Sequence, residues 1–281
     1  MKIDCERIAS AMLEEAREGV KEINRMKQDV PTLVIIKVGN DPASDVYVRN
    51  KVRTCTDLGI ECMVLSLPET VTQAYLEGAI RWMQEKTEVH GLILQLPLPE
   101  HLNAEAAIMV IDPARDVDGL RDDSGVIPCT PRGIMAILDA EVGDLTGKHA
   151  VIVGRSKLVG KPLAKLLLEK DCTVTVCHSK TEDLPAITRT ADILVSAVGK
   201  PGLIELDMVK LGAVIIDVGI NRVDGKLVGD VDPWFSNDLC SLYLCTPVPG
   251  GVGKTTVAAL ALNLVDLAKG SRFKMSSRCA K

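Results

Sequence analysis

A phenol and an amine stand four residues apart in the segment that follows residues 39–42, Gly-Asn-Asp-Pro. Pro42 can occupy the first turn of a helix, and positions i and i+4 of a helix lie on one face. Tyr47 and Lys51 can therefore address one substrate together. Aromatic and lysine neighbours are also common on ordinary helix surfaces, where they only pack and contact water.

A second set of polar groups follows the apolar segment 91–96. Gln95 lies near the carboxyl end of this expected strand, and its amide needs a partner, either backbone or a ligand edge. Asp116 and Asp118 alternate, so an extended chain directs them to opposite sides and only one enters a given pocket. No second acidic cluster offers the oxygen ligands that Mg²⁺ or Ca²⁺ requires, so we expect no metal.

Residues 149–162 have the pattern of a strand, a tight turn and a helix. In a Rossmann unit this arrangement presents helix N-terminal amides to a pyrophosphate. Gly154 takes the first position of the G-x-G-x-x-G fingerprint, but Ser156 and Val159 occupy the second and third. An ordinary strand-to-helix turn therefore stays open as the alternative.

The next expected strand, residues 173–176, ends in Cys177-His178-Ser179-Lys180. NAD-specific enzymes usually carry an acidic residue there for the ribose hydroxyl, and a carboxylate would repel a 2′-phosphate. Arg155, His178 and Ser179 instead supply donors and positive charge, which favours NADP.

Two later strand ends belong to the same expected sheet edge. One carries Gly199, and the other carries Gly219 and Ile220. Small residues there let a nicotinamide ring approach the backbone closely, although simple turns use glycine as well.

The elements that position these groups alternate between apolar, β-branched runs and segments of helical period. Such alternation predicts an α/β fold with mainly parallel sheets. The first helix, about residues 6–26, has one apolar stripe, made of Ile8, Met12, Ala16, Val20 and Ile23. The expected strands are residues 32–38, 63–67, 91–96, 150–154, 173–176, 193–198 and 213–218.

Two lobes are expected, because single hydrophobic cores usually stop growing beyond roughly 250 residues and this chain has 281. The polar stretch 121–125 suggests a division near Leu120. The first lobe would be residues 1–120 and the second, Rossmann-like lobe residues 121–253. The last helix, residues 254–270, would return to the first lobe, and the basic tail, 271–281, would be a solvated end.

Composition limits the class of partner. Hydrophobic residues make up 47% of the chain and aromatic residues only 2%, so the core must be aliphatic, as suits buried parallel strands. The net charge of −5 gives no overall attraction to nucleic acid or an anionic membrane, which leaves a small molecule as the expected ligand.

Nine cysteines without a Cys-x-x-Cys pair are expected to be reduced. The absence of an apolar signal segment predicts a cytoplasmic protein.

Six short motifs occur in one order along the chain. They are Asp41-Pro42-Ala43-Ser44 with Tyr47 and Lys51, Gln95-Leu96-Pro97-Leu98-Pro99, Asp116-Val117-Asp118-Gly119, Pro128-Cys129-Thr130-Pro131, Gly154-Arg155-Ser156 with Val159-Gly160, and Thr246-Pro247-Val248-Pro249-Gly250-Gly251-Val252-Gly253. Together they closely resemble the bifunctional methylenetetrahydrofolate dehydrogenase/methenyltetrahydrofolate cyclohydrolase family over residues 1–267. The resemblance implies NADP-dependent oxidation of 5,10-methylenetetrahydrofolate to 5,10-methenyltetrahydrofolate and hydrolysis to 10-formyltetrahydrofolate. It also implies a homodimer that serves purine biosynthesis.

The resemblance also implies residue roles. Lys51 would be the central catalytic residue, assisted by Tyr47 and Gln95, and Asp118 would accept two parallel N–H bonds from the amino-pyrimidine edge of the pterin. The implied folate-binding residues are Tyr47, Val48, Arg49, Asn50, Lys51, Leu94, Gln95, Leu96, Asp118, Pro249, Gly250, Gly251, Val252 and Gly253. The implied cofactor-binding residues are Gly154, Arg155, Ser156, His178, Ser179, Gly199 and Ile220.

One departure from the family pattern points to a different functional class, an ATPase. The family usually has Pro-Met-Thr after the glycine at 253, whereas this chain has Lys254-Thr255-Thr256 and so resembles the phosphate loop of ParA-type ATPases. Three features oppose an ATPase. Val248 stands where the ordinary motif has its first glycine, Pro249 replaces the signature lysine, and too few residues follow for the remaining strands and the acidic metal ligand.

Two more classes of protein share single features with this chain. Short-chain dehydrogenases also use Tyr-x-x-x-Lys, but their nucleotide loop precedes that pair, whereas here Tyr47 precedes Gly154. A non-catalytic folate or nucleotide sensor could have the same fold, since a fold alone does not prove activity. The joint presence of Tyr47, Lys51, Gln95 and Asp118 argues against a sensor.

Overall fold

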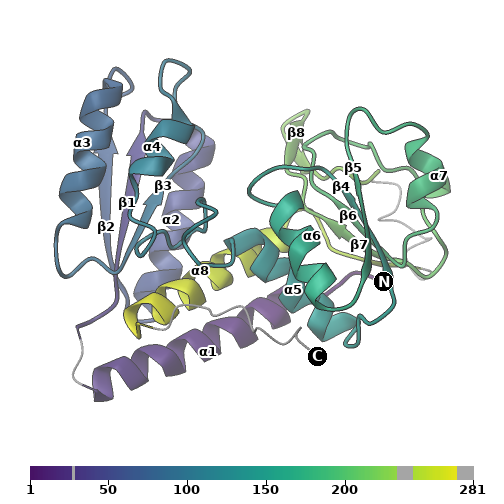
Figure 1. Cartoon of the computed structure of the whole chain (residues 1–281), viewed down its shortest axis with the longest axis horizontal. Helices are drawn as coiled ribbons and strands as arrows, with labels where there is room; N and C mark the ends of the chain where they lie inside the picture. The colour runs from purple at the N-terminus through teal and green to yellow at the C-terminus, as the bar shows by residue number, and fades with distance from the viewer. Residues whose placement is uncertain (27–28, 233–242, 271–281) are drawn as a thin grey trace. The chain divides into compact units, whose positions relative to one another are not determined.

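The computed structural model describes residues 1–26, 29–232 and 243–270. They form two compact units. The three-stranded unit is Met12–Cys129 with the chain from Val257, and the five-stranded unit is Thr130–Thr256 with Met1–Ala11. Figure 1 shows the elements of each. The expected basic tail, 271–281, lies outside the described residues.

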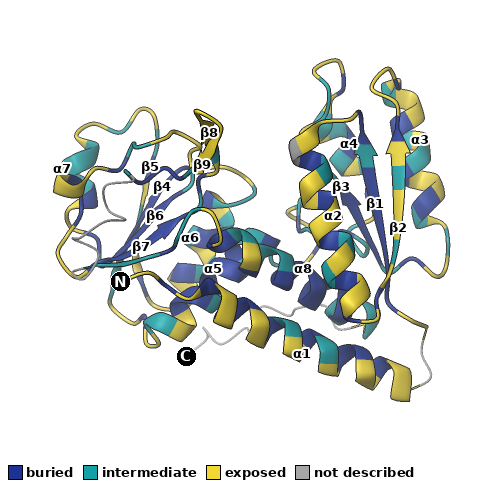
Figure 2. Ribbon diagram, turned by 180° about the vertical axis from the view of Figure 1, so that it is seen from behind, coloured by how far each residue is buried: buried dark blue, intermediate teal, exposed yellow. Residues whose placement is uncertain are grey.

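In the three-stranded unit, β1 (Thr32–Val38) pairs in parallel with β2 (Glu61–Leu67) and β3 (Gly91–Leu94). The helices are α2 (Pro42–Asp57), α3 (Gln73–Gln84) and α4 (Ala104–Val110). One face of β1 carries Val34 and Ile36, which pack in a core cluster with Leu76 and Ile80 of α3. The central strand of a covered parallel sheet is apolar on both faces, and Figure 2 shows β1 and β3 buried.

The first and last helices contribute to both units. The apolar stripe of α1 (Cys5–Arg25) is buried, as its period predicted. In the three-stranded unit α1 packs closely on α8 (Val252–Ala268), because a Cβ at Gly19 would stand 2.4 Å from the Val265 Cγ1. Since α8 from Val257 onward belongs to the three-stranded unit, the predicted return of the last helix is confirmed.

The five-stranded unit has a parallel sheet in the order β10-β7-β6-β4-β5. Its strands are β4 (His149–Val153), β5 (Thr173–Cys177), β6 (Ile193–Ser196), β7 (Val214–Asp217) and β10 (Leu244–Cys245). The other elements are α5 (Cys129–Glu141), α6 (Gly160–Glu169), α7 (Leu184–Thr188), a 3-10 turn η1 (Leu206–Met208), and an antiparallel hairpin of β8 (Asn221–Val223) and β9 (Lys226–Val228). Val151, Leu194 and Ile215 from three adjacent strands share one core cluster.

The predicted α/β fold with two lobes and a Rossmann-like second sheet is confirmed, and each predicted strand is present with ends shifted by at most two residues. β3 ends at Leu94 rather than at residue 96. The Gln95 N–H still donates to the Ile36 carbonyl at 2.8 Å, but Pro97 has no N–H with which to continue the ladder. The hairpin and β10 were not predicted, because their strands are only two or three residues long.

Candidate active site and cofactor edge

α2 presents the phenol and the amine. The Asp41 carboxylate caps the helix by accepting a hydrogen bond from the Ser44 N–H at 2.8 Å, and Pro42 lies in the first turn. Lys51 is only 9% exposed, whereas Tyr47, one turn earlier, is 38% exposed. Burial raises the pKa of the Tyr47 phenol, so this group remains a hydrogen-bond donor at neutral pH.

Lys51 meets a second predicted residue at the carboxyl end of β3. Its Nζ donates to the Gln95 Oε1 at 3.3 Å. The Gln95 Nε2 donates in turn to the Leu96 carbonyl at 2.7 Å, which orients the amide so that its oxygen faces the amine. The Gln95 amide therefore has both a backbone partner and a partner from α2.

A carboxylate completes this group, which we call the lysine cluster: Lys51, Gln95 and Asp118. The Asp118 Oδ2 lies 3.8 Å from the Lys51 Nζ, and the Asp118 side chain is 22% exposed. An amine, an amide and a partly exposed carboxylate thus meet at one place in the three-stranded unit. Such a set can move a proton and can also accept hydrogen bonds from a ligand edge.

The two carboxylates of the Asp116–Asp118 segment have separate tasks. Asp116 is fully buried and accepts hydrogen bonds from the Leu120 and Arg121 N–H groups at 3.1 and 2.8 Å. Burial raises the pKa of its carboxyl group. Asp116 therefore shapes the loop, while Asp118 reaches Lys51.

Asn263, which lies on α8, supports this loop and was not predicted from the sequence. Its buried Nδ2 donates to the Val117 and Ile127 carbonyls, both at 3.0 Å. These bonds hold the chain on either side of Gly119, whose φ is +69° and whose added Cβ would stand 2.7 Å from the Pro128 Cα. The available signal was this single amide within the otherwise apolar stretch 257–265.

The remaining predicted folate residues of this unit differ in exposure. Val48 and Leu94 are buried in the core, Leu96 is half-buried, and Arg49 and Asn50 are exposed. Successive helix positions turn by about 100°, so Arg49 points away from the face of Tyr47 and Lys51, whereas Asn50, three positions after Tyr47, lies at the edge of that face. Their predicted contact with folate stays a prediction.

The predicted cofactor residues follow four adjacent strands of the five-stranded unit. Gly154, Arg155 and Ser156 follow β4, and His178 and Ser179 follow β5. Gly199 and Ile220 come after β6 and β7. Carboxyl ends of parallel strands meet at one sheet edge, so the fold gathers all seven there.

The turn after β4 allows the backbone of α6 to pack very closely. Gly154 has φ +126°, and a Cβ there would stand 2.5 Å from the Ala197 carbonyl oxygen. A Cβ at Gly160 would stand 2.1 Å from the Gly154 carbonyl oxygen. The Ser156 Oγ accepts from the Val159 and Gly160 N–H groups at 3.1 and 3.4 Å. Only glycine fits at positions 154 and 160, and Gly160 replaces the third glycine of the fingerprint, one position later.

Polar donors surround that turn. Arg155, Ser156 and Ser179 are exposed, and His178 is half-buried. The His178 Nδ1 accepts from the Lys180 N–H at 3.2 Å, so the neutral imidazole carries its hydrogen on Nε2. A guanidinium, hydroxyls and an imidazole N–H fit a dinucleotide with an added phosphate, and the described residues at this edge thus suit NADP.

The segment that resembles a phosphate loop has a different arrangement. The Lys254 ammonium pairs with the Glu6 carboxylate. Thr255 is fully buried, and its hydroxyl donates to the Val252 carbonyl at 3.0 Å. A Cβ at Gly133 would stand 2.7 Å from the Thr255 Oγ1. That hydroxyl is packed inside the five-stranded unit, whereas a phosphate loop presents it to a metal ion.

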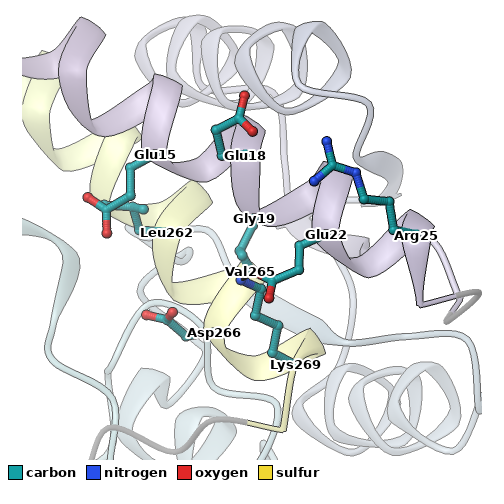
Figure 3. A pocket seen from close by; sticks show the side chains of 9 residues that line it. All are labelled: Glu15, Glu18, Gly19, Glu22, Arg25, Leu262, Val265, Asp266 and Lys269. Atoms are coloured by element: carbon teal, nitrogen blue, oxygen red, sulfur yellow. Dashed lines mark hydrogen bonds and ion pairs between the residues drawn. The ribbon is translucent and has the colours of Figure 1, made fainter.

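A polar hollow of about 400 Å³ lies elsewhere, between α1 and α8 of the three-stranded unit (Figure 3). Glu15, Glu18 and Glu22 of α1 line it, together with Asp266 of α8 and Lys269, which follows the end of α8. The Lys269 ammonium pairs with Glu22, so the hollow holds an internal ion pair. Within residues 1–26, 29–232 and 243–270, no three His, Cys, Asp or Glu side chains are grouped so as to hold a metal ion. None of the helices in these ranges has the length and apolar character to cross a membrane.

Comparisons with known proteins match both parts of the chain to domains of one family. Residues 3–118 match the catalytic domain of tetrahydrofolate dehydrogenase/cyclohydrolase, and residues 128–272 match its NAD(P)-binding domain. The bifunctional protein FolD 2 of Pseudomonas putida is 49% identical over 293 residues, covering 99% of this chain and 96% of the relative. The FolD protein of Exiguobacterium sp. is 45% identical over 275 residues, covering 95% and 98%.

Solved structures agree with this assignment. The bifunctional enzyme FolD of Campylobacter jejuni is 40% identical with a TM-score of 0.90, over 96% of this chain and 99% of that one. The Trypanosoma brucei N5,N10-methylenetetrahydrofolate dehydrogenase-cyclohydrolase, solved with NADP and an inhibitor, is 36% identical with a TM-score of 0.90, over 96% and 98%. The chain belongs to the tetrahydrofolate dehydrogenase/cyclohydrolase family.

Proposed function

We propose that this protein oxidises 5,10-methylenetetrahydrofolate to 5,10-methenyltetrahydrofolate with NADP and then hydrolyses the product to 10-formyltetrahydrofolate. The observation that carries the proposal is the lysine cluster, in which the Lys51 amine meets Gln95 at 3.3 Å and Asp118 at 3.8 Å. The family assignment of both units fits the same two reactions.

On the folate side, we propose that Asp118 accepts two parallel N–H bonds from the amino-pyrimidine edge. A carboxylate that is partly exposed and held by a structured loop is suited to that task. Hydrolysis requires a water oxygen to bond to the methenyl carbon and lose one proton. The carbon's bond to N5 then breaks as the resulting hydroxyl gives up its proton to form the carbonyl and N5 takes up a proton. Lys51 moves these protons, and Gln95 and Tyr47 orient the amine and the substrate.

On the cofactor side, bound NADP would accept the hydride. We propose that Gly154, Ser156 and the start of α6 hold the pyrophosphate, and that Arg155 with the end of β5 binds the 2′-phosphate. Gly199 and Ile220 would border the nicotinamide. The predicted folate residues 249–253 belong to the five-stranded unit and remain a prediction.

Further parts of the proposal concern organisation. We propose a folate-binding domain of residues 1–120 with helix 254–270, and an NADP-binding domain of 121–253. We also propose a cytoplasmic homodimer that supplies one-carbon units for purine biosynthesis, as the resemblance to the family implies. The net charge of −5 supports the further proposal that it binds neither nucleic acid nor an anionic membrane.

The test is direct. The purified protein is incubated with 5,10-methylenetetrahydrofolate and either NADP or NAD, and reduced cofactor, methenyl product and formyl product are recorded. We expect reduced cofactor with NADP in preference to NAD, and formyltetrahydrofolate as the final product. A folded protein that forms neither product would support a non-catalytic sensor and refute the proposal.

A further inference from the structure

A buried carboxylate organises the loops where the nicotinamide is expected. Asp230 is fully buried, and both of its oxygens accept several hydrogen bonds. The donors are the Ser196 hydroxyl at 3.1 Å, the Val198 N–H at 2.8 Å, the Gly199 N–H at 3.2 Å, the Lys200 N–H at 2.8 Å and the Asn221 Nδ2 at 3.2 Å.

These donors come from the ends of two neighbouring strands. Ser196 ends β6 and Asn221 begins β8, just beyond β7. Three successive backbone N–H groups around one anion form a nest, a backbone arrangement that usually binds an external anion. Here the anion is internal, and it fixes the loop that carries Gly199, whose φ is +66°. The preceding Ala197 carbonyl is also the group that faces Gly154.

A second buried carboxylate supports the first. Asp217, 4% exposed, accepts from the Asp230 N–H at 2.9 Å and the Val231 N–H at 3.0 Å. The space is tight, because a Cβ at Gly219 would stand 2.1 Å from the Asp230 Oδ1 and one at Gly229 would stand 1.7 Å from the Asp217 Oδ2. Both carboxylates are therefore closely surrounded by backbone.

An amide cannot replace this carboxylate without loss. The Asp230 Oδ2 accepts from Ser196, Val198 and Gly199, and the Oδ1 accepts from Lys200 and Asn221. Either orientation of an asparagine would therefore place its NH₂ against backbone N–H donors. The change from Asp230 to asparagine removes the charge and at least two hydrogen bonds while keeping the size of the side chain.

We propose that Asp230 is a positioning residue for hydride transfer: it fixes the loop of residues 197–200 and Asn221 in the shape that receives the nicotinamide end of the cofactor. The inference rests on the proposed function and assigns Asp230 to only one of the two activities. Asp230 acts on the cofactor side alone, so its loss impairs the dehydrogenase step. Hydrolysis of supplied methenyltetrahydrofolate consumes no NADP and is therefore unaffected.

The test compares both activities in Asp230→Asn, with Asp224→Asn as the matched control. Asp224 lies in the exposed turn between β8 and β9 with φ +48°, a conformation that asparagine tolerates. For Asp230→Asn we expect kcat/KM for NADP to fall by about 10- to 100-fold, as the loss of hydrogen bonds to a charged group implies. Cyclohydrolase kcat should stay within about twofold, and the control should match the wild type in both assays.

A milder variant covers the case in which Asp230→Asn does not fold. Ser196→Ala removes one donor to Asp230 from a buried position, and we expect it to lower kcat/KM for NADP by a few-fold with hydrolysis unchanged. Equal loss of both activities in the variants, or unchanged NADP kinetics, would overturn the inference. A wild-type protein without NADP-dependent oxidation would instead refute the proposed function.

Discussion

Replacing Lys51 by methionine removes the amine of the lysine cluster while keeping an unbranched side chain of similar length. Lys51 is 9% exposed, so methionine can fill the same space without opening the core. The change deletes the 3.3 Å hydrogen bond to Gln95 and the 3.8 Å ion pair with Asp118. We expect hydrolysis of methenyltetrahydrofolate to fall far more than hydride transfer.

The expected magnitude follows from what the amine does. A positioned acid–base group contributes about 10²- to 10⁴-fold, or about 3–5 kcal/mol of transition-state stabilisation. At 3.8 Å, two unit charges attract by about 4 kcal/mol at an effective dielectric constant of about 20, but desolvation offsets much of this. Asp118 is 22% exposed, so its proposed bonds to the pterin edge can still form in the variant. Binding should therefore change less than cyclohydrolase kcat.

The assay follows loss of methenyltetrahydrofolate at saturating substrate, in parallel with NADP reduction from methylenetetrahydrofolate. Arg53→Met is the control, because Arg53 is a cation on the same helix whose side chain is 84% exposed. We expect Arg53→Met to match the wild type. A Lys51→Met protein that hydrolyses at the wild-type rate would show that the Lys51 amine has only a structural role, and the active-site assignment would fail.

Three further predictions test different parts of the structure. Arg155→Ala should raise KM for NADP more than KM for NAD, because the guanidinium is exposed at the edge that would bind the 2′-phosphate, and equal losses in steady-state kinetics would remove that role. Calorimetry at millimolar ATP should detect no Mg²⁺-dependent binding, because Thr255 is buried and Lys254 pairs with Glu6; saturable binding lost in Thr255→Ala would restore the ATPase hypothesis. Burial raises the pKa of Asp217 from 3.8 to about 6, so the folded protein keeps a proton that the unfolded chain has released. This group's contribution to stability is therefore full below about pH 4 and is lost as pH rises through about 6, a change of about 3 kcal/mol. Urea unfolding of Asp217→Asn should show a variant that gains stability relative to wild type over that interval, and a difference independent of pH would contradict the assignment.

Local sequence patterns predicted most of the fold. The stripe of α1 and the apolar runs of β1, β4 and β6 could be recognised because helix and strand periods depend on neighbouring residues alone. The spacing of Tyr47 and Lys51 belongs to the same class, since α2 places them one turn apart whatever surrounds it. The short hairpin β8–β9 was missed because its exposed strands carry no period long enough to recognise.

The helices and strands, the order of the motifs, and therefore the family could all be inferred from the linear chain. Which polar groups meet depends on the packed units. The pairing of β1 with β3 brings Gln95 to Lys51, and the bridge between Leu92 and Asp116 places Asp118 beside them. α8 returns with Asn263 to hold the Asp118 loop. The same is true of Asp230, which the sequence presents as one of many acidic residues. Contacts between distant segments depend on packing of the whole unit, and no local period encodes them.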